Sequence, residues 1–121
     1  MSVKSFKDLL VWQKAMDLVE EVYILVKLLP KEELYALSNQ IRRSAVSIPS
    51  NIAEGQQRRS TKEFVNFISF AKGSTAELQT QLWICVRLNY LTNEQIQKAM
   101  GLIEEISKML TKLSASLSDT N

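Results

Sequence analysis

The feature that most constrains the fold of this chain is an apolar periodicity close to 3.6 residues that continues along almost the whole sequence. This period is typical of helices that bury one face. It is interrupted at three places, near residues 29–31, 59–61 and 89–93. Only three glycines and two prolines occur among 121 residues, which disfavours a turn-rich β fold and leaves no Gly-rich phosphate loop. The sequence therefore predicts four helices.

The first helix is expected over residues 7–28, with one apolar face turned to the core. Ser5, followed by Asp8 three residues later, is a start signal, and Pro30 ends the segment because proline disfavours helical geometry in the residue before it. The predicted core face consists of Trp12, Ala15, Met16, Val19, Val22, Tyr23 and Val26.

The second helix is expected from about Lys31 to Arg59, with Pro49 inside it. A proline in a helix interior removes a backbone hydrogen bond and costs about 3 kcal/mol, so either the helix kinks there or two shorter helices meet. We favour the kink because the apolar stripe stays in register from Ile48 to Ile52.

The third and fourth helices begin at capping boxes. Ser60 with Glu63, and Thr92 with Gln95, have the spacing that satisfies free N–H groups at the start of a helix. Apolar residues follow each box at helical spacing, and those of the last helix form a near-heptad seam. Both segments are therefore expected to be long helices that pack against their neighbours.

Short connections between the helices predict the topology, because they make successive helices antiparallel neighbours. The expected fold is all-α: an antiparallel up-down-up-down four-helix bundle that forms a single domain over residues 1–121, with a frayed polar tail at about 118–121. Leucine, isoleucine, valine and phenylalanine make up about 31% of the chain, which excludes an intrinsically disordered protein.

Composition also narrows the location and the chemistry. There is no histidine and only one cysteine, which excludes an internal disulfide and a multi-cysteine metal site. The longest uncharged run, residues 44–53, is too short to span a membrane, and the first residues lack the apolar core of a signal peptide. We expect a cytoplasmic protein with no cofactor, no metal site and no membrane association.

Catalytic groupings are nearly absent from the sequence. Three serines at helical spacing have no histidine partner: Ser44, Ser47 and Ser50. Cys85 falls on the apolar face of the third helix, which predicts a buried, unreactive thiol. The adjacent pair Glu32-Glu33 is expected to be solvated surface charge. We therefore expect no enzymatic activity.

Several apolar residues fall outside the predicted core faces. Such surplus apolar surface either is scattered surface residues or marks an interface, and we favour self-association. The interface candidates are Phe70, Trp83 and Ile84 on the third helix, with Tyr35 and Val46 on the second. Gly73 and Gly101 lie opposite their helices' stripes, and they are either tolerated surface glycines or points of close approach by a neighbouring subunit.

Basic residues gather in the second helix and at its junction with the third. The candidates for phosphate contact are Arg42, Arg43, Arg58, Arg59 and Lys62, with Lys72 and Arg87 as weaker ones. Ordinary solvated charge is the alternative, since the formal net charge is only +2. Adjacent residues diverge by about 100° on a helix, so only one of Arg42 and Arg43 is expected to face a given ligand. Glu54 is placed to pair with Arg58.

Four segments of the chain resemble a bacterial family of four-helix-bundle proteins that includes the 23S rRNA intervening-sequence proteins. They read FKDLLVWQKA (6–15), QIRRSAVSIPSNIAEG (40–55), RSTKEFVNF (59–67) and AKGSTAELQTQL (71–82), in order and with similar spacing. One departure is Gln79, where the family motif usually has a glutamate, so a role for that carboxylate is not expected here.

The resemblance implies an up-down bundle that assembles as a homopentameric ring and is not an enzyme. A related branch, the accessory variability determinants of diversity-generating retroelements, binds nucleic acid and a reverse transcriptase through basic surfaces. The expectation is a non-enzymatic, homo-oligomeric accessory protein that binds structured RNA. The alternative is a protein-interaction scaffold that docks a partner such as a reverse transcriptase without binding RNA.

Overall fold

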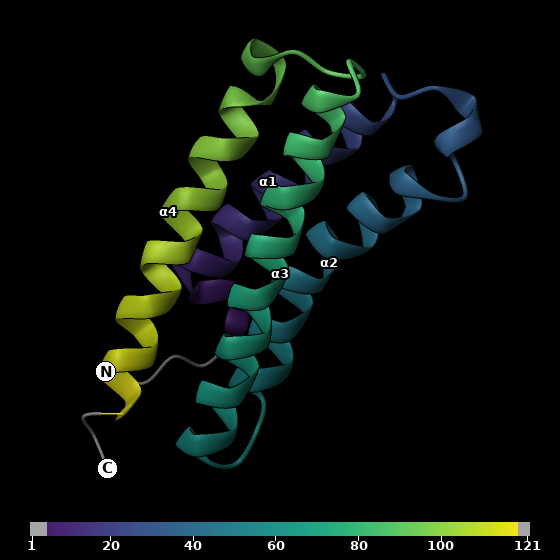
Figure 1. Cartoon of the computed structure of the whole chain (residues 1–121). Coiled ribbons are helices and arrows are strands. Elements are labelled where there is room, and N and C mark those ends of the chain that lie inside the picture. Colours follow the sequence, from purple (N-terminus) through teal and green to yellow (C-terminus); the bar gives the residue numbers. More distant parts are fainter. Residues whose placement is uncertain (1–4, 119–121) are drawn as a thin grey trace.

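The computed structural model describes residues 5–118, and every regular element in this span is a helix. The α-helices are α1 (Leu10–Val26), α2 (Leu37–Gln56), α3 (Thr61–Arg87) and α4 (Asn93–Ser118), and two short 3-10 helices, η1 (Phe6–Asp8) and η2 (Lys31–Glu33), precede α1 and α2. The chain runs up, down, up and down through the four α-helices, which confirms the predicted all-α fold (Figure 1). Apart from Ser118, the predicted polar tail lies outside the described residues.

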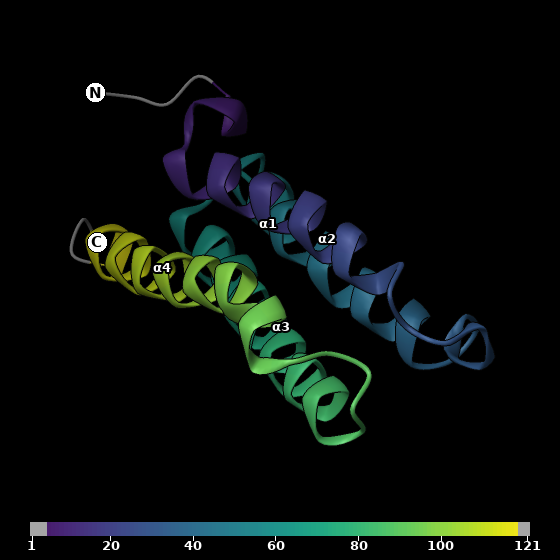
Figure 2. The same cartoon turned by 90° about the horizontal axis from the view of Figure 1, so that it is seen from above.

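The four helices pack in a cycle, α1 on α2, α2 on α3, α3 on α4 and α4 on α1. Seen from above, α1 and α2 form one layer and α3 and α4 form the other (Figure 2). Each helix turns an apolar stripe to the centre, where fully buried leucines and isoleucines from all four helices meet. Burying these stripes together is the main stabilising term, because each large apolar side chain contributes about 1.5–3 kcal/mol.

The buried face of α1 differs from the one that the sequence indicated. Of the seven predicted residues, Ala15, Val22 and Val26 are buried, Trp12 and Val19 are half-buried, and Met16 and Tyr23 are exposed. The helix instead turns Val11, Leu18 and Leu25 into the core. Because α1 is apolar around most of its circumference, two overlapping stripes satisfy the helical period, and only packing selects one.

α2 begins six residues later than predicted, at Leu37 instead of Lys31. Residues 31–33 form η2, and the Glu33 carboxylate caps α2 by accepting the Leu37 N–H at 3.3 Å. Its other oxygen accepts the Tyr90 hydroxyl at 2.8 Å, so Glu33 is a structural group and not the solvated charge that we expected. From Leu37 onward α2 is a single helix that passes through the buried Pro49, so the alternative of two shorter helices is wrong.

The turn between α2 and α3 brings the two backbones close together at Gly55. A Cβ atom on Gly55 would lie 2.6 Å from Cβ of Phe67 and 3.0 Å from Cδ1 of Phe64. No side chain larger than hydrogen fits at such a distance without moving one of the helices, which explains why glycine stands here. The exposed Gly73 and Gly101, in contrast, have open space around the Cβ position.

Both predicted capping residues are found at the helix starts. The Ser60 hydroxyl accepts the Glu63 N–H at 3.1 Å, although the Glu63 carboxylate accepts the Ser60 hydroxyl instead of its backbone N–H. At α4 the box is complete: Thr92 Oγ1 accepts the Gln95 N–H at 3.1 Å, and Gln95 Oε1 accepts the Thr92 N–H at 2.9 Å. These local bonds fix where α3 and α4 begin.

α3 ends in a left-handed residue, Asn89, whose φ is 62°. The N–H groups of Tyr90 and Asn89 bond to the carbonyls of Cys85 and Val86 at 2.8 and 3.0 Å, the two bonds of a Schellman motif. Asparagine tolerates this backbone region better than other residues with a side chain, apart from aspartate and histidine. The predicted break near residues 89–93 is thereby confirmed.

Candidate nucleic-acid and subunit interfaces

The predicted basic residues of α2 and the following turn form two separate groups. Arg42 and Arg43 lie in the first half of α2, whereas Arg58, Arg59 and Lys62 form a turn cluster between α2 and α3. Arg42 lies 14 residues before Gln56, the last residue of α2, which corresponds to about 21 Å at 1.5 Å per helical residue, and Arg58 follows in the turn. One phosphate group therefore cannot meet both, and a nucleic acid would have to span them.

Arg42 and Arg43 have different surroundings, as their divergence on the helix predicts. Arg42 is half-buried and donates from Nη2 to the Leu34 carbonyl at 3.4 Å, which ties α2 to the segment before it. Arg43 is exposed and has no hydrogen bond or ion pair within residues 5–118. Of the two, Arg43 is the one whose guanidinium is available to a phosphate.

Within the turn cluster, Arg58 is already engaged. It donates to Glu54 at 3.1 Å, which confirms the predicted pair, and it lies 3.9 Å from the Glu63 carboxylate. Its guanidinium also sits over the Phe67 ring, 4.7 Å from the centroid. Arg58 therefore holds α2, the turn and α3 together, while the exposed Arg59 and Lys62 have no partner in the described part of the chain.

The two weaker candidates lie apart from these groups on α3. Lys72 is half-buried near the middle of the helix, and Arg87 is its last residue and exposed. They are separated by 15 residues, about 22 Å along the helix axis. The two residues therefore do not form a compact basic group with each other.

All five interface candidates are exposed, but they do not form one surface. Phe70 and Ile84 are 14 residues apart and therefore share a face of α3, within about 40° of each other. Trp83 lies about 140° around the helix from Phe70, on another side. Tyr35, in the segment before α2, is 91% exposed.

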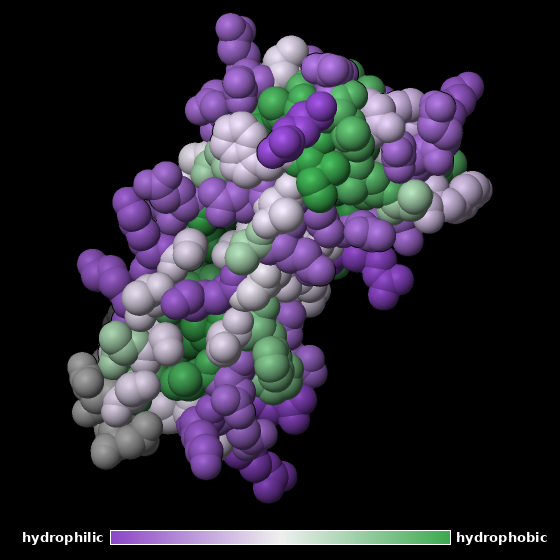
Figure 3. All heavy atoms as spheres, viewed as in Figure 1, coloured by the Kyte–Doolittle hydropathy of each residue, from purple (hydrophilic) through white to green (hydrophobic). Residues whose placement is uncertain are grey.

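Apolar side chains gather near the C-terminal end of α3 and the adjoining end of α2 (Figure 3). Besides Ile84, the exposed apolar residues beside these helix ends include Leu88, directly after α3, and Leu34, shortly before α2. Exposed apolar surface of this kind is typical of a binding interface.

A second apolar surface lies between α1 and α2, and the sequence indicated only its α2 side, at Val46. Its outer groove has a volume of about 420 Å³. The side chains that line it include Trp12, Met16, Val19, Val46, Pro49 and Ala53. Three of these, Trp12, Met16 and Val19, belong to the predicted core face of the first helix. The signal that could have revealed the groove was the apolar character of both sides of α1.

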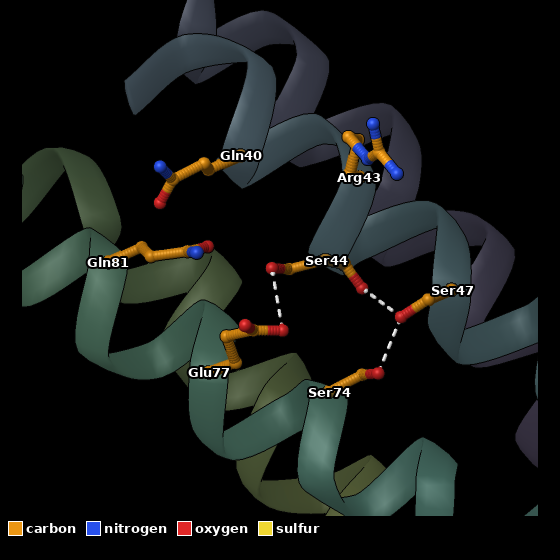
Figure 4. A pocket seen from close by; sticks show the side chains of 7 residues that line it. All are labelled: Gln40, Arg43, Ser44, Ser47, Ser74, Glu77 and Gln81. Carbon is orange, nitrogen blue, oxygen red and sulfur yellow. Dashed lines mark hydrogen bonds between the residues drawn. The ribbon is translucent and has the colours of Figure 1, made fainter. Parts of the chain in front are cut away.

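Between α2 and α3 lies a polar groove of about 410 Å³ (Figure 4). The residues lining it include Arg43, Ser44, Ser47, Ser74, Glu77 and Gln81. The Ser44 hydroxyl donates to Glu77 Oε1 at 3.2 Å, and the hydroxyls of Ser47 and Ser74 hydrogen-bond to each other. The sequence contains no histidine, so these serines have no imidazole base beside them. Their hydroxyls serve here as hydrogen-bonding groups.

The single thiol has no catalytic surroundings. Cys85 is fully buried in the core, as predicted, and burial together with the negative charge of Glu33 raises the pKa of its thiol from 9.0 to about 11. The thiol is therefore protonated at neutral pH and a poor nucleophile. Within residues 5–118, no cluster of three acidic or cysteine side chains could hold a metal ion, and no helix is long and apolar enough to cross a bilayer.

Comparison with known proteins places the fold in a family. A crystal structure of a protein of unknown function from the S23 ribosomal protein family of Bacteroides thetaiotaomicron is similar, with a TM-score of 0.80 and 29% sequence identity. The match covers 87% of this chain and 98% of that one. No curated protein matches. The family model described as 23S rRNA-intervening sequence protein matches residues 7–112, and the chain therefore belongs to that family.

Proposed function

We propose that this protein is a non-enzymatic, homo-oligomeric accessory protein that binds structured RNA through basic side chains of α2 and the turn cluster. The observation that carries the proposal is that Arg43, Arg59 and Lys62 are exposed and unpaired within the described residues. Arginine suits phosphate because its planar fork can bond two oxygens at once. Arg42 and Arg58 support the site by positioning, because both are held by neighbouring groups.

Self-association would strengthen phosphate binding by a subunit whose own positive charge is small. The formal net charge of one chain is only +2, but a closed ring repeats each basic group once per subunit. A ring needs two different surfaces that fit each other head to tail. The outer groove between α1 and α2, and the apolar side of α3 that carries Phe70 and Ile84, are the two different surfaces that we propose for this contact. Five subunits is the number that the family resemblance implies.

The RNA proposal is tested by the salt dependence of binding to a structured RNA, measured by fluorescence anisotropy. Each phosphate contact contributes about 0.7–0.9 to the slope of log K against log salt. The double variant Arg59→Ala with Lys62→Ala should weaken binding and flatten the slope by about two units per subunit that contacts the RNA. Arg43→Ala should flatten it by about one unit.

Two control variants distinguish direct phosphate contacts from a general effect of positive charge on RNA binding. Lys112→Ala removes one exposed positive charge from α4, on a helix that carries neither basic group, and should leave the slope unchanged. Arg42→Ala should affect stability more than the slope, because its guanidinium is bonded to Leu34. If RNA affinity is undetectable at low salt, or if none of the α2 and turn variants changes it, the phosphate-binding surface is refuted.

In that case the scaffold becomes the better proposal, and the exposed apolar residues of α3 favour it independently of RNA. A relationship to the accessory variability determinants, which the sequence resemblance suggests, would make the partner a reverse transcriptase. The genes beside the reading frame distinguish the two branches: a surrounding rRNA gene supports the first and a neighbouring reverse transcriptase supports the second.

A further inference from the structure

The polar groove between α2 and α3 contains a buried acceptor that no residue of the described span 5–118 satisfies. Gln81 is only 7% exposed, and its Oε1 atom is buried with no hydrogen-bond partner among the described residues. In Figure 4 the side chain extends from α3 across the groove toward Ser44. Buried carbonyl oxygens are nearly always paired, so an orphaned one indicates that a donor from outside the chain belongs beside it.

The groups around Gln81 show what kind of donor is missing. Glu77 lies four residues earlier, on the same side of α3, and its carboxylate has no ion pair within residues 5–118. One of its oxygens accepts the Ser44 hydroxyl at 3.2 Å, which leaves the other open to the groove. Arg43 lies at the rim, but its guanidinium points away from Glu77 (Figure 4). The floor of the groove is therefore rich in acceptors and carries a negative charge.

We propose that the polar groove binds a small molecule through a primary ammonium group. Such a group has three N–H donors, which match Gln81 Oε1, the open oxygen of Glu77 and a lone pair of the Ser44 hydroxyl. Its positive charge matches the Glu77 carboxylate and makes the bonds charge-assisted. A calcium ion fits less well, because it takes about six to eight oxygen ligands and the groove offers one carboxylate. The volume of about 410 Å³ leaves room for the rest of a small amine.

This proposal does not rest on RNA binding, and its test contains no nucleic acid. The ¹⁵N-labelled protein is titrated with n-butylammonium chloride at constant ionic strength, and backbone amide shifts are followed by NMR. We expect saturable shifts at residues 44–47 and 74–81, with a Kd on the order of 1 mM, as for other small ligands with few contacts. Tetramethylammonium, which has the charge but no N–H, and 1-butanol, which has no charge, should bind at least about tenfold more weakly.

Variants of the two acceptors test the site directly. Gln81→Leu and Glu77→Gln should each weaken butylammonium binding about tenfold or more, because the first removes an acceptor and the second removes the negative charge. Gln79→Leu is the matched control, since Gln79 is exposed on the same helix and lies outside the groove lining, and it should bind like the wild type. Gln81→Leu should also raise the urea midpoint without ligand, because it removes an unpaired buried oxygen.

The proposal is overturned if butylammonium gives no saturable shift, which would mean that water alone satisfies Gln81. It is equally overturned if Gln81→Leu and Glu77→Gln bind as tightly as Gln79→Leu, or if tetramethylammonium competes on equal terms. Because Glu77 is exposed and Glu77→Gln keeps its shape, that variant tests the site even if Gln81→Leu does not fold.

Discussion

Gly55→Ala is the substitution whose effect follows most directly from the structure. The new Cβ would lie 2.6 Å from Cβ of Phe67, an atom fixed to the α3 backbone, so rotating a side chain cannot relieve the clash. Forcing extra volume into a packed site costs about 1–3 kcal/mol. Alanine regains about 0.5–1 kcal/mol because it is the better helix former. The net expectation is a loss of about 1–2 kcal/mol in the free energy of unfolding.

Thermal unfolding followed by circular dichroism, at one protein concentration for all variants, measures this effect. A loss of 1 kcal/mol lowers Tm by about 4 °C in a chain of this length, so Gly55→Ala should unfold about 4–8 °C below the wild type. Gly73→Ala and Gly101→Ala are matched controls with open space at Cβ, and each should raise Tm by about 2–4 °C.

An unchanged or raised Tm for Gly55→Ala would show that α2 and α3 do not approach each other as closely as described, and it would refute the reasoning. A lowered Tm for Gly73→Ala or Gly101→Ala would mean that a neighbouring subunit covers that glycine, the alternative that the sequence left open.

The thiol of Cys85 should resist a maleimide in the folded protein at neutral pH and react only after unfolding in urea; labelling of the folded protein would contradict its burial. Because the folded-state pKa of this thiol is raised from 9.0 to about 11, the folded protein holds the proton more tightly, so its contribution to stability is complete below about pH 9 and is lost as the pH rises toward 11. Asn89→Gly should raise the free energy of unfolding by up to about 1 kcal/mol, since glycine adopts φ 62° without strain, and Asn89→Val should lower it by about 1–2 kcal/mol in urea titrations. Light scattering should give a mass several times 13.8 kDa at micromolar concentration, and Phe70→Ser and Trp83→Ser should show which side of α3 is covered, because only the variant in the interface lowers that mass. A monomer at that concentration would contradict self-association.

The helices themselves were predictable from the sequence to a large extent. The caps at Ser60 and Thr92 and the break after α3 are encoded within a few residues, and the structure confirms them. The start of α2 was not, because the cap is the carboxylate of Glu33, a residue that is also bonded to Tyr90 far along the chain. Local patterns predict local bonds and fail where a distant residue takes part.

The same distinction between local patterns and distant contacts applies to the candidate site. The sequence indicated which side chains are basic, and it predicted that Arg42 and Arg43 would differ, because that follows from helix geometry. It predicted the pair of Arg58 with Glu54, but it could not show that Glu63 and a ring of α3 also hold Arg58, since both belong to the next helix. The polar groove also escaped it, because Ser44 and Glu77 meet only across the α2–α3 contact.

By itself, the sequence determined that this protein is a bundle of four helices with short connections, since periodicity, capping and scarce glycine act within a few residues of chain. Only the tertiary structure decided which side of α1 is buried, why Gly55 must be glycine and where Gln81 is left without a partner. Those features depend on distances between residues of different helices, and such distances are fixed only when the helices pack.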